Sequence, residues 1–281
     1  MRVLNTIDEM RAFSSKAEMR GRVLGLVPTM GALHEGHLSL VRAARQKCNS
    51  VVASIFVNPT QFGPNEDFAR YPRNLDQDCT MLEREHVDAV FAPTAEEMYP
   101  GGALTWVTVE GMSDRLCGRS RPGHFRGVTT VVCKLFNVVQ PDVAFFGQKD
   151  AAQVAIIQRM VRDLLLPVSI EVCPIVREPD GLAMSSRNAY LNAEEREASL
   201  VLHRSLEQAQ RLFEAGQRAA EELSNAGKRE FSQEQKARLD YFEIVDPGSL
   251  EPVSAISKPT LIAVAAFVGN TRLIDNIIVI P

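Results

Sequence analysis

The chain has 281 residues, a formal net charge of −4 and the composition of an ordinary soluble protein. This length can bury a large core and, at about 150 residues per domain, suggests two domains. The charge balance argues against general nucleic-acid binding, which requires a basic field. Five scattered cysteines, an odd number with no Cys-x-x-Cys pair, argue against a disulfide framework or a zinc ribbon.

The sequence carries no pattern for export or membrane insertion. Residues 1–9 meet charge, at Asp8 and Glu9, too early for a secretory signal peptide, and the apolar run at residues 261–268 is too short to cross a bilayer. We therefore expect a cytoplasmic protein in a reducing compartment.

The first clear element is the apolar run at residues 22–27, which ends at Pro28 and suits a buried parallel strand. Glycines at 31 and 36 predict a tight turn after it, and apolar spacing predicts a helix that begins near His37. The start of a helix presents free N–H groups that attract anions. His34 and His37 are three residues apart, so both imidazoles can donate to one triphosphate. The alternative is a pair of ordinary surface or core histidines.

Strand-like and helical patterns then alternate, which is typical of a βαβ sheet. The predicted strands are residues 51–57, 87–91, 104–109, 143–146 and 168–175. The clearest predicted helices, residues 127–139 and 150–164, each have one apolar face that can cover a sheet. Residues 1–175 are therefore predicted to form one α/β domain.

After residue 176 the chain changes character. The predicted elements there are charge-rich helices at 193–216 and 219–233 and strands at 241–245, 261–268 and 274–280. They predict a smaller α+β domain over residues 176–281. Because no long linker precedes it, we expect the two domains to pack together with a cleft between them.

Two strand ends carry polar side chains, and ligands of open α/β sheets bind at such ends. Asn58 and Gln61 follow the strand at 51–57, and neutral amides suit a substrate rich in hydroxyls and carbonyls; the alternative is a simple Asn-Pro turn. After the strand at 143–146, Lys149 supplies a point charge for phosphate, unless it is a solvated surface lysine. Asp150 can cap the following helix or bind a ribose hydroxyl, and Gln153 lies one helical turn further on.

Two further segments carry polar and positive side chains. Ser185, Ser186 and Arg187 combine hydroxyls with a guanidinium, a set that suits a polyphosphate; the alternative is a helix cap with a solvated charge. Residues 119–127 carry positive charge that can help to hold an acidic substrate, unless they form a basic surface loop. No nucleophile elbow or catalytic cysteine setting is recognisable, so covalent catalysis is not favoured.

Residues 28–37, 58–62, 121–128, 147–153 and 184–188 resemble, in this order, the motifs of the pantothenate synthetases, or pantoate–β-alanine ligases. Residues 34–37 and 184–187 are also similar to the paired "HIGH" and "KMSKS" signatures of class I aminoacyl-tRNA synthetases and nucleotidylyltransferases. The resemblance implies a Rossmann-like adenylating domain.

The resemblance also implies an activity in pantothenate and coenzyme A biosynthesis. ATP and Mg²⁺ drive the joining of pantoate to β-alanine through a pantoyl-adenylate, with AMP and pyrophosphate released. Mg²⁺ is expected to bind mainly through the ATP phosphates, without a dedicated protein metal site. The family suggests a homodimer with small-molecule partners only, and neither nucleic acid nor membrane.

By the same resemblance, His37 is a catalytic residue that donates a proton or stabilises charge, and His34 and Lys149 assist at the phosphates. The ATP site would comprise Met30, Gly31, Ala32, Leu33, His34, Glu35, Gly36, His37, Gly147, Gln148, Lys149, Asp150, Val176, Met184, Ser185, Ser186 and Arg187. Gln61, Gln153 and, less directly, Asn58 would contact pantoate or lie near β-alanine. Residues 151 and 152 are alanines where related sequences often carry larger side chains, which affects only the outer wall of the pantoate pocket.

Three other functions fit parts of this pattern. A nucleotidylyltransferase would use the same histidine turn but form no amide, and a nucleotide-sensing module would need no second-substrate pocket. An aminoacyl-tRNA synthetase would need an RNA-reading domain, for which the last ~100 residues are short and not notably basic.

Overall fold

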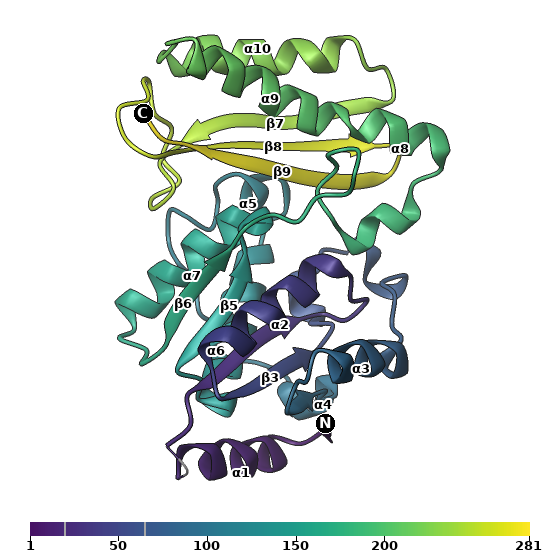
Figure 1. The fold of residues 1–281 in the computed structure, drawn as a ribbon, viewed down its shortest axis with the longest axis vertical. Coiled ribbons are helices and arrows are strands. Elements are labelled where there is room, and N and C mark those ends of the chain that lie inside the picture. The colour runs from purple at the N-terminus through teal and green to yellow at the C-terminus, as the bar shows by residue number, and fades with distance from the viewer. Residues whose placement is uncertain (20, 65) are drawn as a thin grey trace.

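The computed structural model describes residues 1–19, 21–64 and 66–281 and contains two sheets (Figure 1). The first has six parallel strands in the order β1-β4-β3-β2-β5-β6, and the second has three antiparallel strands in the order β7-β8-β9. In Figure 1 the second sheet lies above the first, with α9 and α10 on its far side. The predicted fold class, a parallel α/β part followed by a smaller α+β part, is confirmed.

The elements have the following bounds. The parallel strands are β1 (Arg2–Leu4), β2 (Leu24–Thr29), β3 (Ser50–Ile55), β4 (Ala89–Phe91), β5 (Val143–Gly147) and β6 (Ser169–Cys173). The helices between them are α1 (Ile7–Glu18), α2 (Glu35–Lys47), α3 (Leu75–Arg84), α4 (Ala95–Met98), α5 (Cys117–Ser120), α6 (His124–Val139) and α7 (Ala151–Asp163). Single 3₁₀ segments are η1 (Pro59–Gln61), η2 (Asp67–Ala69), η3 (Gln148–Asp150) and η4 (Ser186–Tyr190). The C-terminal part comprises α8 (Ala193–Ser199), α9 (Val201–Glu214), α10 (Ala220–Ser232), β7 (Ala237–Val245), β8 (Thr260–Val268) and β9 (Thr271–Val279).

The parallel sheet is buried on both faces, which explains why its strands are continuous apolar runs. Successive strand side chains point to opposite faces. Leu26 and Phe146 accordingly pack with α1, α6 and α7, whereas their neighbours Val27 and Phe145 pack with α2 and α3. The helices on the two faces fix the carboxyl ends of β2 and β5 in a rigid frame.

The second sheet divides its side chains in the same way. Ile262 and Val264 of β8 pack under α9 and α10, whereas Leu261 and Ala263 join the core of the first sheet. The two parts of the chain therefore share a core, as the absence of a long linker predicts.

Several predicted elements differ from the structure. Residues 104–109 form no strand. Side chains of α6 bond the backbone of Val107 instead: Thr130 Oγ1 accepts from its N–H, and Thr129 Oγ1 donates to its carbonyl. The predicted helix at 193–216 is two helices that meet at Leu200. Its N–H donates to the carbonyl of Glu197, three residues earlier, which is a 3₁₀-type hydrogen bond. Sequence reasoning missed α1 and α3, although a Thr6–Glu9 capping box marks the start of α1. None of the helices in the described ranges is both long enough and apolar enough to span a membrane.

Candidate active site

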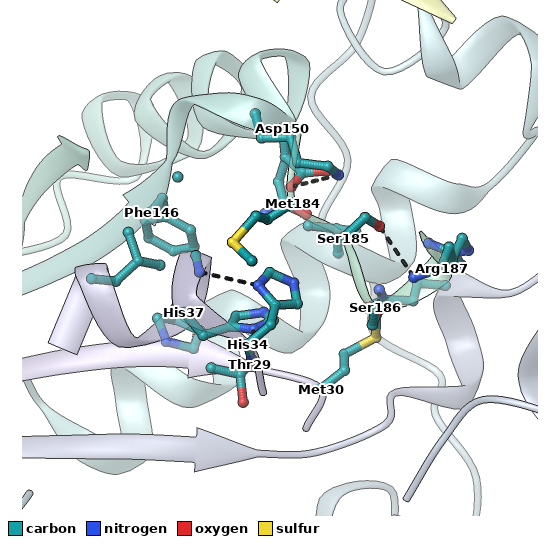
Figure 2. Close-up of a pocket in the computed structure, with 18 of the residues that line it drawn as sticks. Thr29, Met30, His34, His37, Phe146, Asp150, Met184, Ser185, Ser186 and Arg187 are labelled. Atoms are coloured by element: carbon teal, nitrogen blue, oxygen red, sulfur yellow. Dashed lines mark hydrogen bonds and ion pairs between the residues drawn. The ribbon is translucent and has the colours of Figure 1, made fainter. Parts of the chain in front are cut away.

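A pocket opens at the carboxyl ends of β2 and β5, which are neighbours in the sheet. The chain leaves β2 toward β3 on one side and leaves β5 toward β6 on the other, so this is the point where the strand order reverses, the usual ligand position in such sheets. Most of the predicted site residues line it (Figure 2): Met30, His34, Gly36, His37, Gln61, Gly147, Lys149, Asp150, Gln153, Val176, Met184, Ser185, Ser186 and Arg187. Segments more than 150 residues apart in sequence, from Met30 to Arg187, are thus brought together.

Six predicted residues support the pocket without lining it. Gly31, Ala32 and Leu33 form the turn between Met30 and His34. Glu35 pairs with Arg42 on the surface of α2, and the Gln148 side chain turns away to Asn276 of β9. Asn58 is hydrogen-bonded to Gln61 and is only 1% exposed. Ligand contact by these six stays a prediction.

The turn after β2 depends on a residue that sequence reasoning missed. Gly31 and Ala32 both adopt positive φ, 79° and 51°, and the buried carboxylate of Asp78 in α3 holds them there. Its Oδ2 accepts from the Ala32 N–H at 3.0 Å, and its Oδ1 accepts from the Leu33 N–H at 2.8 Å. A Cβ atom at Gly31 would lie 2.8 Å from Asp78 Oδ2, so only glycine fits this approach.

We predict that Asp78→Ala lowers the free energy of unfolding by about 2 kcal/mol, since it leaves two inward-facing N–H groups without an acceptor. The turn that carries His34 should loosen, so turnover should fall too. Urea denaturation and the steady-state rate measure the two effects. Asp76→Ala, on an exposed position of the same helix, should change neither; equal effects of both variants would contradict the role of Asp78.

Gly36 has a different role from the one predicted. It lies inside the first turn of α2, not in the turn that precedes it. A Cβ atom there would come within 2.9 Å of the His34 ring. Glycine at this position therefore provides space for the imidazole.

The two histidines form a tilted ring pair at the start of α2, with ring centroids 4.1 Å apart and an angle of 39° between the ring planes. His34 is the N-cap residue, and its Nδ1 accepts from the Gly36 N–H at 3.1 Å. His37 Nδ1 accepts in turn from the His34 N–H at 3.4 Å. Because both Nδ1 atoms accept backbone hydrogen bonds, the proton of each neutral ring is on Nε2.

Burial lowers the pKa of His34 to about 4, with a smaller contribution from the positive charge of Lys149. Burial also lowers the pKa of His37 to about 3, followed by the effects of His34 and Lys149. Both imidazoles are therefore neutral at pH 7 in the ligand-free protein. A neutral ring can donate a hydrogen bond from Nε2, so the role expected for His37 narrows to that of a hydrogen-bond donor, and this role stays a prediction.

The neutral amides form a second wall. Gln61 is 9% exposed, and its Nε2 donates to Met30 Sδ at 3.1 Å. Asn58 Nδ2 holds Gln61 Oε1 at 3.1 Å and also donates to the Gly127 carbonyl, so Asn58 orients Gln61. Gln153, on α7, lines the same pocket from the other side.

Two arginines near the pocket are already paired with carboxylates in this structure. Arg187 makes two bonds to the Asp67 carboxylate, at 3.0 and 2.9 Å, so it is not the solvated charge of the alternative interpretation. Arg121 is held by Glu66 in the same bidentate manner and also donates to His124 Nε2. The segment 119–127 therefore carries less free charge than its sequence suggests.

Lys149 and Asp150 lie at the end of β5, where Gly147 leaves open space beside the backbone. The Lys149 Nζ is 3.9 Å from Asp150 Oδ2. Asp150 occupies the N-cap position of α7 but makes no side-chain cap bond, so the predicted capping role is wrong and its carboxylate stays available to a ligand. Within residues 1–19, 21–64 and 66–281, no group of three or more His, Cys, Asp or Glu side chains could hold a metal ion.

Comparison with known proteins gives one consistent family. The family model described as pantoate-beta-alanine ligase matches residues 2–278. A pantothenate synthetase of Koribacter versatilis is 58% identical over 278 residues, covering 99% of this chain and 96% of the relative. A pantothenate synthetase of Thermotoga petrophila is 56% identical, with 99% of each chain covered.

Solved structures agree with this result. The crystal structure of pantothenate synthetase from Thermus thermophilus has a TM-score of 0.95 and 46% identity, and all of both chains is covered. The pantoate-beta-alanine ligase of Francisella tularensis, solved in complex with beta-gamma ATP and beta-alanine, has a TM-score of 0.82 and 35% identity over 99% of this chain and 97% of that one.

Proposed function

This chain belongs to the pantoate–β-alanine ligase family, and we propose that the pocket at the ends of β2 and β5 is where it works. The chain joins pantoate to β-alanine with the use of ATP and forms pantothenate, AMP and pyrophosphate through a pantoyl-adenylate. We assign residues 1–175 to a domain that binds ATP and pantoate, and residues 176–281 to a domain that covers the site.

One observation carries the assignment of the site: two neutral imidazoles, each with its proton on Nε2, line the same pocket as Lys149 and the 184–187 loop. Such a set offers fixed N–H donors and a cation to phosphate oxygens without a strong base. None is needed, because the attacking carboxylate of pantoate is already an anion.

In the first half-reaction, a carboxylate oxygen of pantoate attacks the α-phosphorus of ATP, and the bond to the β-phosphate breaks. His34, His37, Lys149, Ser185, Ser186 and Arg187 stabilise the charge that develops on the phosphates and on the departing pyrophosphate. For this, Arg187 exchanges its partner Asp67 for a phosphate. Met30 and the turn 31–36, residues 147–150, Val176 and Met184 complete the ATP site.

In the second half-reaction, the amine of β-alanine attacks the acyl carbon of the adenylate. The amine attacks in its neutral form; as the new C–N bond forms, the C–O bond to phosphate breaks, AMP leaves with the electron pair, and the extra proton on nitrogen passes to solvent water. Gln61 and Gln153 hold the pantoyl group with neutral amides, and Asn58 acts by orienting Gln61. Burial of the adenylate keeps water from competing with the amine.

Mg²⁺ is the expected companion of ATP, and the residues present fit an ion carried mainly by phosphates. Mg²⁺ usually keeps several waters and takes one or two carboxylates, and Asp150 lines the pocket with a half-exposed carboxylate. When bound, the ion neutralises phosphate charge.

We also propose a cytoplasmic location and a homodimer. All five cysteines are free thiols in the structure, which suits a reducing compartment. Residues 104–109 belong to neither sheet, and Leu104 is 98% exposed, so this segment offers an apolar surface to a second copy. Light scattering should find twice the chain mass, and a monomer at micromolar concentration would contradict the dimer.

The deciding assay supplies ATP, Mg²⁺ and pantoate, with or without β-alanine. We expect a burst of about one pyrophosphate per site without β-alanine, and continuous AMP release only when it is added, because the adenylate waits for the amine. Chelation of Mg²⁺ should stop the burst. Continuous AMP release without β-alanine would contradict the proposed order of steps.

A further inference from the structure

Asn276 is a buried polar residue of β9, in the C-terminal sheet, far in sequence from the phosphate-binding motifs. It is 2% exposed, and its amide is fully used. Its Nδ2 donates to the Gln148 carbonyl at 2.9 Å and to the Lys149 carbonyl at 3.0 Å. Its Oδ1 accepts from Gln148 Nε2 at 3.2 Å. All three bonds end on η3, the single 3₁₀ turn that carries Lys149.

Few side chains other than that of Asn276 fix this turn, which runs between the paired end of β5 at Gly147 and the start of α7 at Ala151. It contains three residues, no side chain caps its start, and Asp150 makes no cap bond to the helix that follows. The Gly147 that precedes it has open space on its Cβ side. The backbone position of Lys149 thus depends on the two carbonyl bonds from Asn276.

We propose that Asn276 is a positioning residue for adenylation, acting through the backbone of Lys149 to fix its ammonium group at the phosphates. This inference rests on the role proposed above for Lys149. It assigns the C-terminal sheet a function beyond covering the pocket: β9 sets the geometry of a charge contributed by the first domain.

The residue before Asn276 supports the same conclusion independently. Asp275, 3% exposed, makes a bidentate ion pair with Arg177, at 2.6 and 3.0 Å. Arg177 donates in turn to the Gly181 carbonyl and bridges to Ala183, at the base of the loop that presents residues 184–187. Two adjacent residues of β9 therefore hold the two separate segments that supply Lys149 and Arg187 to the pocket.

Loss of the Asn276 amide would leave two carbonyl groups without their donor and allow η3 to shift. A displacement of about 1 Å at a reacting group can cost about 10²-fold in rate. We expect Asn276→Ala to lower the kcat for pantoate-dependent pyrophosphate release by about 10- to 100-fold. The KM for β-alanine should change little, because Lys149 acts before the amine enters.

The test is a double-mutant cycle with Asn276→Ala, Lys149→Ala and the double variant. If Asn276 acts through Lys149, Asn276→Ala should lower kcat by less than about 3-fold in the Lys149→Ala background, because the effects of coupled residues are not additive. The matched control is Thr260→Ala in the neighbouring strand, which is equally buried and loses a bond to the Lys258 carbonyl. It should lower the melting temperature with kcat unchanged.

Additive losses in the cycle, or an Asn276→Ala variant that loses only thermal stability as Thr260→Ala does, would overturn the inference. Should Asn276→Ala fail to fold, Asn276→Ser replaces it in the same cycle: its single hydroxyl can donate to only one of the two carbonyls, so a smaller loss of kcat with the same coupling to Lys149→Ala is expected. A Lys149→Ala enzyme with a normal rate would instead refute the proposed role of Lys149. The two failures are therefore distinguishable.

Discussion

Replacement of His37 by alanine should lower kcat/KM for pantoate-dependent pyrophosphate release by about 10²-fold or more, the usual cost of losing one preorganised donor to developing charge. The His37 ring is partly buried in the wall of the pocket, and its Nδ1 accepts from the His34 N–H, so its Nε2 proton faces a fixed place in the pocket (Figure 2). Pre-steady-state quantification of pyrophosphate measures this first half-reaction alone.

Two comparisons test the reason for that loss. His37→Gln retains an N–H donor at about the same reach and should recover part of the rate, whereas His86→Asn, an exposed residue with positive φ that asparagine tolerates, should have no effect. With its pKa lowered to about 3 by burial, His37 does not titrate between pH 6 and 8 in the free enzyme. The ratio of wild-type to His37→Ala kcat/KM should therefore stay constant over this range; a tenfold change would mean that the charged ring is the active form.

The parts of the fold that local pattern specifies were predictable. The buried strands show as apolar runs, and α6 and α7 show as helices with one apolar face, because burial requires that spacing whatever the tertiary context. The residues at the strand ends were predictable for a topological reason: parallel strands bring their carboxyl ends to one edge, so Met30, Gln61 and Lys149 had to lie near one another.

The parts that depend on distant partners were not predictable. Residues 104–109 have the composition of a strand, but the backbone of Val107 at their centre bonds to Thr129 and Thr130 of α6 instead of to a strand. Asp78 differs from Asp76 only in the direction it faces, which the sequence of α3 does not reveal. Asn276 is likewise an ordinary strand residue until β9 is packed against η3. In each case the function of the residue is created by a contact more than 20 residues away.

The pairing of Arg121 and Arg187 with carboxylates was also not predictable, because it too depends on distant partners. A count of positive charges around residues 119–127 and 187 predicts an attractive field, but Glu66 and Asp67 pair with Arg121 and Arg187 in the absence of substrate. Side chains that must release a carboxylate before they bind phosphate contribute less net affinity than their charge suggests. A cation without so close a partner then matters most for the first encounter with ATP.

Lys149 is that cation, and Lys149→Ala should reduce pyrophosphate release by about 10²-fold or more. Its Nζ is 3.9 Å from Asp150 Oδ2, beyond hydrogen-bond distance, so the ammonium group can turn to a phosphate without breaking a strong pair. A single-turnover measurement at saturating ATP separates this effect from weaker nucleotide binding.

Lys149→Arg distinguishes charge from geometry at this position. If the site needs only a positive charge, arginine should restore most of the rate; if it needs a compact ammonium at a fixed point, arginine should remain at least tenfold slow, because its guanidinium is planar and larger. We expect the second result, since the backbone of Lys149 is fixed by Asn276 and cannot shift to accommodate the longer side chain. Lys16→Ala, at an exposed position of α1 that does not line the pocket, controls for charge loss alone and should leave the rate unchanged. Full recovery in Lys149→Arg would show that the position of the charge matters less than its sign.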